Sequence, residues 1–328
     1  MSEITSELNP FVPRRWLHNG HAQTIASYFV RRKDRLPAAE RRGFQVAEDT
    51  QLICDCHWQA DKSGAMTAII VHGLEGSSES SYVLGTAAKA LAAGMNVVRM
   101  NMRNCGGTEK LTPTLYHSGF SQDLAAVVSE LIQKDTLTRI ALVGFSMGGN
   151  LVLNLVGEWG AAKPNAVRAS ATVSPVMDLA PSADALHNRS NRIYENKFVR
   201  GLSRLFTRKA KLFPPRYDLN RLQGVRSIRE FDERITAPYS GFRDADDYYA
   251  RVSSSRLAER IAIPSLVLYS TDDPFIRLLP ETRAKLRANA FVKYIETERG
   301  GHCAFLAEAN GYDGRWAERT VIEFLRQF

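Results

Sequence analysis

Short segments typical of strands, such as the nearly continuous apolar run at 66–71, alternate with helical patterns along most of this chain of 328 residues, which limits the folds open to it. The segments typical of strands lie at 66–71, 95–100, 139–145, 168–174, 264–270 and 291–297. The helical patterns lie at 82–94, 123–133, 147–160, 280–289 and 312–327. A strand, a helix and a second strand form a crossover unit, and nearly continuous apolar strands are buried on both faces. The alternation therefore predicts an α/β fold with a mostly parallel central sheet flanked by helices.

Two parts of the chain depart from this alternation. The first 40 residues read as irregular, so we expect 1–43 to form an N-terminal arm packed on a main domain at 44–328, which opens with two strands at 44–58. From about 175 to 260 the chain is polar, basic and without short apolar strands. This interruption predicts a helical cap, inserted between two strands and folded over one edge of the sheet.

The positive charge is concentrated in the predicted cap. The whole chain has 43 Lys and Arg against 35 Asp and Glu, and the window 186–234 alone has 13 against 5, so this window accounts for the net charge of +8. A local excess favours a basic patch, and it argues against a general nucleic-acid-binding chain. Because aromatic residues are interleaved there, we expect weak contact with an anionic membrane surface and no nucleic-acid partner. The alternative is a solvated helical face that only keeps the protein soluble.

Cysteine usage and the N-terminal sequence bear on the compartment. Four cysteines are too few for a disulfide framework, and their spacing does not match a zinc site. The N-terminus has no signal-peptide pattern, and no apolar run approaches ~18 residues. We therefore expect a cytoplasmic protein.

A candidate nucleophile, Ser146, stands in the sequence GFSMGG, where an apolar strand ends directly before it and a helix begins directly after it. A sharp strand-to-helix turn would hold the serine in a strained conformation above the sheet, and Gly144 and Gly148 leave room for that turn. The alternative is a helix-capping serine followed by glycines. The context favours a nucleophile.

A serine hydroxyl needs a histidine to take its proton and a carboxylate to orient the histidine. His302, in RGGHCAF, follows the last predicted strand and is the candidate base. Asp273, in STDDPF, lies just beyond a strand end and is the preferred acid. The alternatives are Asp272 beside it and Asp178 after an earlier strand.

An oxyanion formed by serine attack needs two donors already in place. The backbone N–H of Met147 directly follows the serine, and the backbone N–H of Leu74 lies in the glycine-rich loop HGLEGSSES at 72–80. The alternative for this loop is a simple turn into a helix. We expect the two amides to form an oxyanion hole.

With these residues in view, the chain resembles the α/β-hydrolase superfamily from about residue 44 to the end. The resemblance is carried, in order, by HGLEG, GFSMGG, STDDPF and GGHCAF. The chain is more particularly similar to the YheT-type branch of predicted esterases, which is related to eukaryotic α/β-hydrolase-domain lipases and to yeast medium-chain ester synthases. That narrower likeness rests on NPFVPRRWLHNGHAQTI (9–25), RNCGGT (103–108), LYHSGFSQDL (115–124) and SPVMDL (174–179).

The resemblance implies a serine hydrolase with the triad Ser146, Asp273 and His302, which acts without a metal or an organic cofactor. The expected substrates are small-molecule or lipid esters with short to medium acyl chains. An acyltransferase that passes the acyl group to an alcohol is the alternative, because the same machinery serves both reactions. A peptidase is chemically open as well. A non-catalytic or nucleic-acid-binding protein is disfavoured, because all three triad residues are present and no nucleic-acid-binding motif is.

Overall fold

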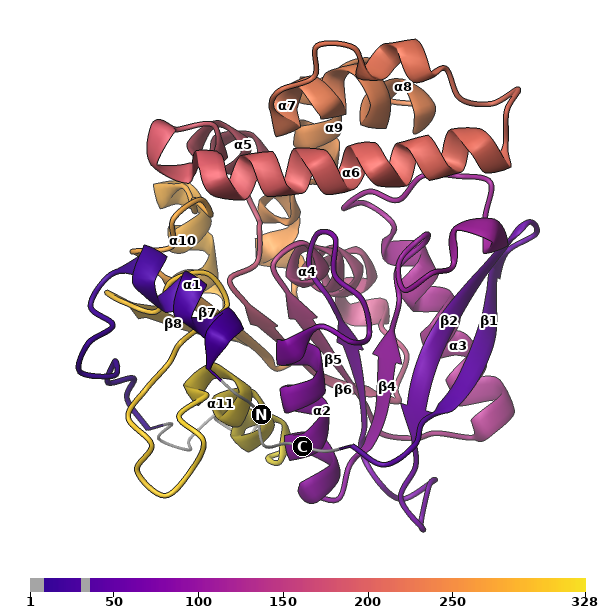
Figure 1. Ribbon diagram of the computed structural model, residues 1–328. Coiled ribbons are helices and arrows are strands. Elements are labelled where there is room, and N and C mark those ends of the chain that lie inside the picture. Colours follow the sequence, from indigo (N-terminus) through magenta and orange to yellow (C-terminus); the bar gives the residue numbers. More distant parts are fainter. Residues whose placement is uncertain (1–8, 31–35) are drawn as a thin grey trace.

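The computed structural model describes residues 9–30 and 36–328 (Figure 1). Within these residues eight strands form one sheet in the order β1-β2-β4-β3-β5-β6-β7-β8. They are β1 (Glu40–Ala47), β2 (Thr50–His57), β3 (Thr67–Val71), β4 (Asn96–Met100), β5 (Ile140–Phe145), β6 (Val167–Val173), β7 (Ser265–Ser270) and β8 (Val292–Thr297). β2 pairs antiparallel with both β1 and β4, and the other neighbours pair parallel. The prediction of a mostly parallel sheet is confirmed.

Helices cover both faces of the sheet. They are α2 (Ser81–Ala92), α3 (Ser121–Asp135), α4 (Met147–Trp159), α10 (Pro280–Ala288) and α11 (Trp316–Leu325). Successive side chains of a strand point to opposite faces, so Ala68 and Ile70 of β3 join one apolar core and Ile69 and Val71 join the other. The first core also contains residues of α2 and α11, and the second contains residues of α3 and α4. This three-layer arrangement brings the carboxyl ends of the parallel strands to one edge, where sites of such sheets form.

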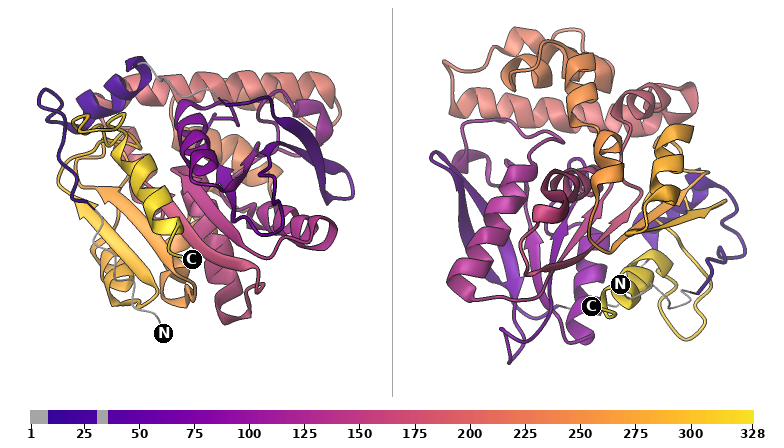
Figure 2. Two further views of the ribbon diagram at one scale, coloured as in Figure 1. Left: turned by 90° about the horizontal axis from the view of Figure 1, so that it is seen from below. Right: turned by 180° about the vertical axis from the view of Figure 1, so that it is seen from behind.

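Between β6 and β7 the described chain contains helices and no strand. The α-helices are α5 (Leu179–Leu186), α6 (Arg192–Leu212), α7 (Ile228–Phe231), α8 (Ala237–Tyr239) and α9 (Ala245–Val252); a π-helical turn (Asp232–Thr236) joins α7 to α8, and short 3-10 helices lie in the connections. They form a layer over the carboxyl edge of the sheet, and α6 runs across most of its width (Figures 1 and 2).

The far end of α6 is fixed to the body by buried polar contacts. The Lys209 side chain is fully buried, and its Nζ donates to the backbone oxygens of Glu109, at 3.1 Å, and Thr112. The Tyr217 hydroxyl donates to the backbone oxygen of Pro113. Since a buried ammonium without acceptors would be costly, these contacts hold α6 against the 109–113 segment.

The described part of the N-terminal region is not irregular throughout, as the sequence had suggested. It contains the helix α1 (Gly20–Phe29), whose N-cap is the Asn19 side chain, and β1 begins at Glu40, inside the segment assigned to the arm. α1 escapes an apolar-periodicity search because its buried residues are Gly20, Gln23 and Thr24. Residues 1–8 and 31–35 of the expected arm lie outside the described residues. None of the described helices is both long and apolar enough to cross a bilayer.

Candidate active site

Ser146 lies at the junction of β5 and α4, with φ of 53° and ψ of −118°. Such a conformation costs a non-glycine residue about 1–3 kcal/mol, and it is held here by the elements on either side. A Cβ on Gly148 would lie 2.4 Å from the backbone oxygen of His72, and one on Gly144 would lie 2.4 Å from that of Gly148. The backbones therefore pack too closely for any side chain at these two positions, and the strand-to-helix turn expected from the sequence is present.

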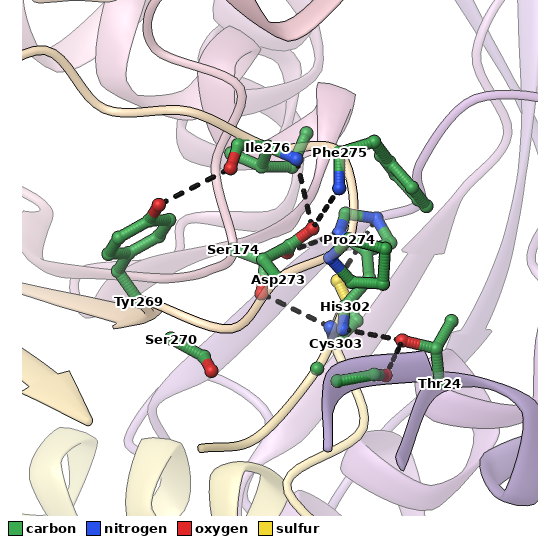
Figure 3. A network of polar contacts seen from close by, with 12 residues as sticks. Thr24, Ser174, Tyr269, Ser270, Asp273, Pro274, Phe275, Ile276, His302 and Cys303 are labelled. Carbon is green, nitrogen blue, oxygen red and sulfur yellow. Dashed lines mark hydrogen bonds and ion pairs between the residues drawn. The ribbon is translucent and has the colours of Figure 1, made fainter. Parts of the chain in front are cut away.

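His302 and Asp273 form a close pair at the same edge of the sheet (Figure 3). The distance from His302 Nδ1 to Asp273 Oδ2 is 2.8 Å, and the aspartate side chain has no exposed surface. The other oxygen, Oδ1, accepts hydrogen bonds from the backbone N–H groups of Phe275, at 3.1 Å, and Ile276, at 2.9 Å. Because the carboxylate is fixed as an acceptor, the imidazole must carry its proton on Nδ1, and its Nε2 is left free to accept one.

The surroundings of His302 change its pKa in two directions. Burial lowers the pKa, but the Cys303 thiol and the Asp273 carboxylate raise it more strongly, so it lies well above the ordinary value. Cys303 Sγ is 3.8 Å from Nε2 of His302. The Cys303 backbone has a φ of 56°, and its N–H donates to Ser174 Oγ at 3.1 Å. The residue after the histidine is therefore held so that its thiol lies beside the ring.

Ser146 and His302 line the same pocket, together with Leu74, Tyr82 and Phe198. In this conformation the described residues offer no hydrogen bond to the Ser146 hydroxyl. Contacts between a nucleophile and its base are often long in a free enzyme and shorten when substrate binds. The arrangement thus places a serine and an oriented imidazole at one opening.

The other two candidate carboxylates have different partners. Asp178 accepts hydrogen bonds from the backbone N–H of Leu279, at 2.9 Å, and from the Thr282 hydroxyl, at 3.0 Å, both at the start of α10. Asp272 accepts from the Ser270 hydroxyl and from the backbone N–H of Gly301, at 2.9 Å. Of the three, the structure brings only Asp273 to the imidazole.

The backbone N–H groups of Leu74 and Met147 have no acceptor among the described residues, although both residues line the cavity that reaches Ser146. Met147 is the first residue of α4, where the helix dipole favours negative charge. Two free amides beside a serine are what an oxyanion requires.

The loop that carries Leu74 is held by the buried side chain of His72 and the half-buried side chain of Tyr82. His72 Nε2 accepts a hydrogen bond from the backbone N–H of Met102 at 3.2 Å, so Nδ1 carries the proton and donates to the backbone oxygen of Gly73 at 2.7 Å. Burial lowers the pKa of His72 to about 4, so the ring is neutral at neutral pH. The Tyr82 hydroxyl accepts from the N–H of Gly73 at 2.9 Å. The loop is therefore rigid before any substrate arrives.

Helix α1 contributes residues that the sequence reasoning missed. Thr24 Oγ1 accepts a hydrogen bond from the backbone N–H of His302 at 2.9 Å (Figure 3). Gln23 Nε2 donates to the backbone oxygen of Leu306 at 3.1 Å, and its Oε1 accepts from the N–H of the same residue at 2.8 Å. The N-terminal helix thus holds both ends of the histidine loop. The only sequence signal for this role of α1 was the resemblance of residues 9–25 to the YheT-type branch.

A cavity of about 120 Å³ extends from Ser146 beneath the helices between β6 and β7. Most of its lining is apolar and includes Leu115, Val176, Leu186, Leu202 and Phe231. Such a lining suits an apolar chain held next to the serine. Within the described residues no group of three or more His, Cys, Asp or Glu side chains is placed to hold a metal ion.

Among the known proteins similar in sequence to this chain, two match nearly its whole length. YheT of Escherichia coli (strain K12) is 30% identical over 325 residues, which cover 97% of this chain and 93% of YheT. The phospholipase ABHD3 of Mus musculus is 30% identical over 327 residues, which cover 96% of this chain and 78% of ABHD3.

Solved structures show the same fold at lower identity. The esterase Pf2001 of Pyrococcus furiosus superposes with a TM-score of 0.56 and 16% identity, and the match covers 97% of this chain and 98% of that protein.

The family model of the α/β hydrolase fold matches residues 69–309, which include the serine, the aspartate and the histidine described above. The chain therefore belongs to the α/β hydrolase fold family, as its sequence motifs suggested.

Proposed function

We propose that this protein is a serine hydrolase that cleaves carboxylic esters through Ser146, His302 and Asp273. The observation that carries the proposal is the 2.8 Å contact between Asp273 and Nδ1 of a histidine that shares its pocket with a strained serine. Relatives named as a phospholipase and, among solved structures, as an esterase support ester chemistry.

In the proposed reaction, the Ser146 hydroxyl attacks the ester carbonyl and passes its proton to Nε2 of His302. The Leu74 and Met147 N–H groups stabilise the oxyanion, and Asp273 stabilises the imidazolium. The imidazolium then protonates the leaving alcohol, and the acyl group stays on the serine. Water, activated by the same imidazole, releases the acid and restores the serine.

We assign the acyl chain to the apolar cavity beneath the helices between β6 and β7, which act as a cap over the site. A small-molecule or lipid ester with a short to medium acyl chain would place that chain against Leu202 and Phe231, next to the serine. The expected arrangement is thus a catalytic domain at 44–328 with a cap insertion at about 175–260. Helix α1, which precedes the domain, holds the histidine loop.

The proposal is tested by labelling with a fluorophosphonate probe and by the turnover of p-nitrophenyl esters of increasing chain length. Ser146→Ala should abolish labelling and lower kcat about 10⁶-fold with an unchanged circular dichroism spectrum. Ser63→Ala, at an exposed serine away from the site, is the matched control and should keep both activities. Retained turnover in folded Ser146→Ala would refute the assignment. Adding an alcohol to the assay and measuring the new ester would distinguish hydrolysis from acyl transfer.

A further inference from the structure

Helix α1 presents an apolar face to the solvent. Ile25, Tyr28 and Phe29 are 44%, 66% and 79% exposed. Residues three and four positions apart lie on the same side of a helix, so these three side chains form one continuous strip. Large apolar side chains gathered in this way mark an interaction surface more often than scattered single ones do.

Helix α6 continues this surface. The His21 ring of α1 stacks on Tyr194 of α6, with centroids 5.7 Å apart, and Lys197 Nζ lies 4.5 Å from the centroid of the Tyr28 ring. Ile193, at the start of α6, is 77% exposed. In Figure 1 both helices lie toward the viewer, and the left view of Figure 2 shows them at the same upper edge. The two helices thus share one face of the molecule.

The α6 part of this face is basic. Lys197, Arg200 and Arg204 are exposed, and their spacing of three and four residues places them on the same side of the helix as Ile193. None of the three forms an ion pair with a described residue. The half-buried Glu75 lies near two of them: burial raises its pKa, and the charges of Lys197 and Arg204 lower it. Most of the charge on this face is therefore available to an outside partner.

The opening of the candidate active site lies on the same face. The pocket that contains Ser146 and His302 is also lined by Tyr28 of α1 and Phe198 of α6. A substrate that enters between the two helices passes the exposed apolar strip and the basic residues. This location links the surface to substrate delivery.

We propose that this face, formed by Ile25, Tyr28 and Phe29 of α1 and by Ile193, Lys197, Arg200 and Arg204 of α6, docks on an anionic phospholipid bilayer. The apolar side chains would enter the interface between head groups and acyl chains, and the basic side chains would contact the anionic head groups. Charge complementarity selects this partner over a neutral surface. The docking would present the pocket to membrane-borne esters, and only this consequence rests on the proposed function.

The test is flotation of the whole protein, as Ser146→Ala, with phosphatidylglycerol-containing vesicles and with pure phosphatidylcholine vesicles, at low and high salt. The inactive variant measures docking without turnover. We expect strong binding to the anionic vesicles that high salt weakens. Arg200→Gln with Arg204→Gln should weaken it about 25-fold, at about fivefold for each charge removed. Phe29→Ser with Ile193→Ser should weaken it at least tenfold.

Matched controls separate this surface from general charge and apolarity. Arg260→Gln with Arg326→Gln removes two exposed arginines elsewhere, and Phe291→Ser removes another exposed aromatic ring; neither should change vesicle binding. Equal binding to both vesicle types, or indifference to salt, would overturn the proposal. So would a concentration-dependent dimer that Phe29→Ser dissociates without any vesicle binding, because the occupant would then be a second copy. Turnover of a soluble p-nitrophenyl ester by the wild-type protein tests the proposed function separately.

Discussion

Replacing Asp273 by asparagine tests how the carboxylate controls the candidate base. Asp273 Oδ1 accepts two backbone N–H groups, so the amide oxygen of an asparagine must stay on that side. The amide NH₂ group then faces Nδ1 of His302, which can no longer donate there. The imidazole must carry its proton on Nε2, the atom that should receive the proton of Ser146. The variant is therefore expected to keep its fold and lose its base.

The expected loss in kcat is about 10⁴-fold, the size measured for the same change in the best-studied serine protease triad. It corresponds to about 5 kcal/mol of transition-state stabilisation. The assay is p-nitrophenyl ester turnover, with thermal unfolding measured in parallel. Because the two backbone hydrogen bonds survive, the unfolding temperature should change by only a few degrees.

Asp178→Asn and Asp272→Asn are the matched control variants. In Asp178→Asn the amide oxygen can still accept from Leu279, and the NH₂ group can donate to the Thr282 hydroxyl, which is able to reverse its role. In Asp272→Asn the amide oxygen can still accept from Gly301. Both should cost less than about tenfold in turnover, since neither side chain contacts the imidazole. If Asp178→Asn lost turnover while Asp273→Asn kept it, the acid would be wrongly assigned.

Three further outcomes are expected. Because the pKa of His302 is raised above its ordinary value, kcat/KM should be at its maximum above that pKa and fall as the pH drops through it. Cys303→Ala should move this acidic side of the pH profile to lower pH. An unchanged profile would contradict the contribution of the thiol to the raised pKa. Gly148→Ala should lower the free energy of unfolding by about 1–3 kcal/mol in calorimetry, because its Cβ would lie 2.4 Å from the backbone oxygen of His72. Unchanged stability would show that the strand-to-helix turn can widen to accept the methyl group. Burial raises the pKa of Glu75 to about 7, above its unfolded value, so folding becomes less favourable as the pH rises toward 7. Glu75→Gln should then be more stable than the wild type by about 1 kcal/mol at pH 8, with little difference at pH 5, and the opposite order would refute the burial argument.

The strands and helices of the main domain could be predicted because their patterns are local. The run 140–145 has no polar side chain, and its burial on both faces in β5 follows from that composition. The helix α1 could not be predicted in this way. Its buried side chains are polar, and they are satisfied by Leu306 and His302, which lie more than 270 positions away.

The residues of the candidate site also differ in how far local sequence predicts them. Ser146 is identifiable from sequence because a strand, a glycine-flanked serine and a helix are consecutive, and their sterics alone enforce the turn. The choice of Asp273 over Asp178 and Asp272 depends on which carboxylate reaches His302 across the sheet edge, a distance that local sequence does not encode.

The sequence by itself determined the fold class, the order of the proposed triad and the location of the basic segment, because local apolar patterns, glycine sterics and charge counts specify them. Tertiary structure decided which carboxylate orients the imidazole, that α1 holds the histidine loop, and that α1 and α6 share the face with the pocket opening. These features arise from contacts between segments far apart in the chain. Such contacts form only when burial of the two apolar cores brings the segments together, so no single stretch of sequence carries them.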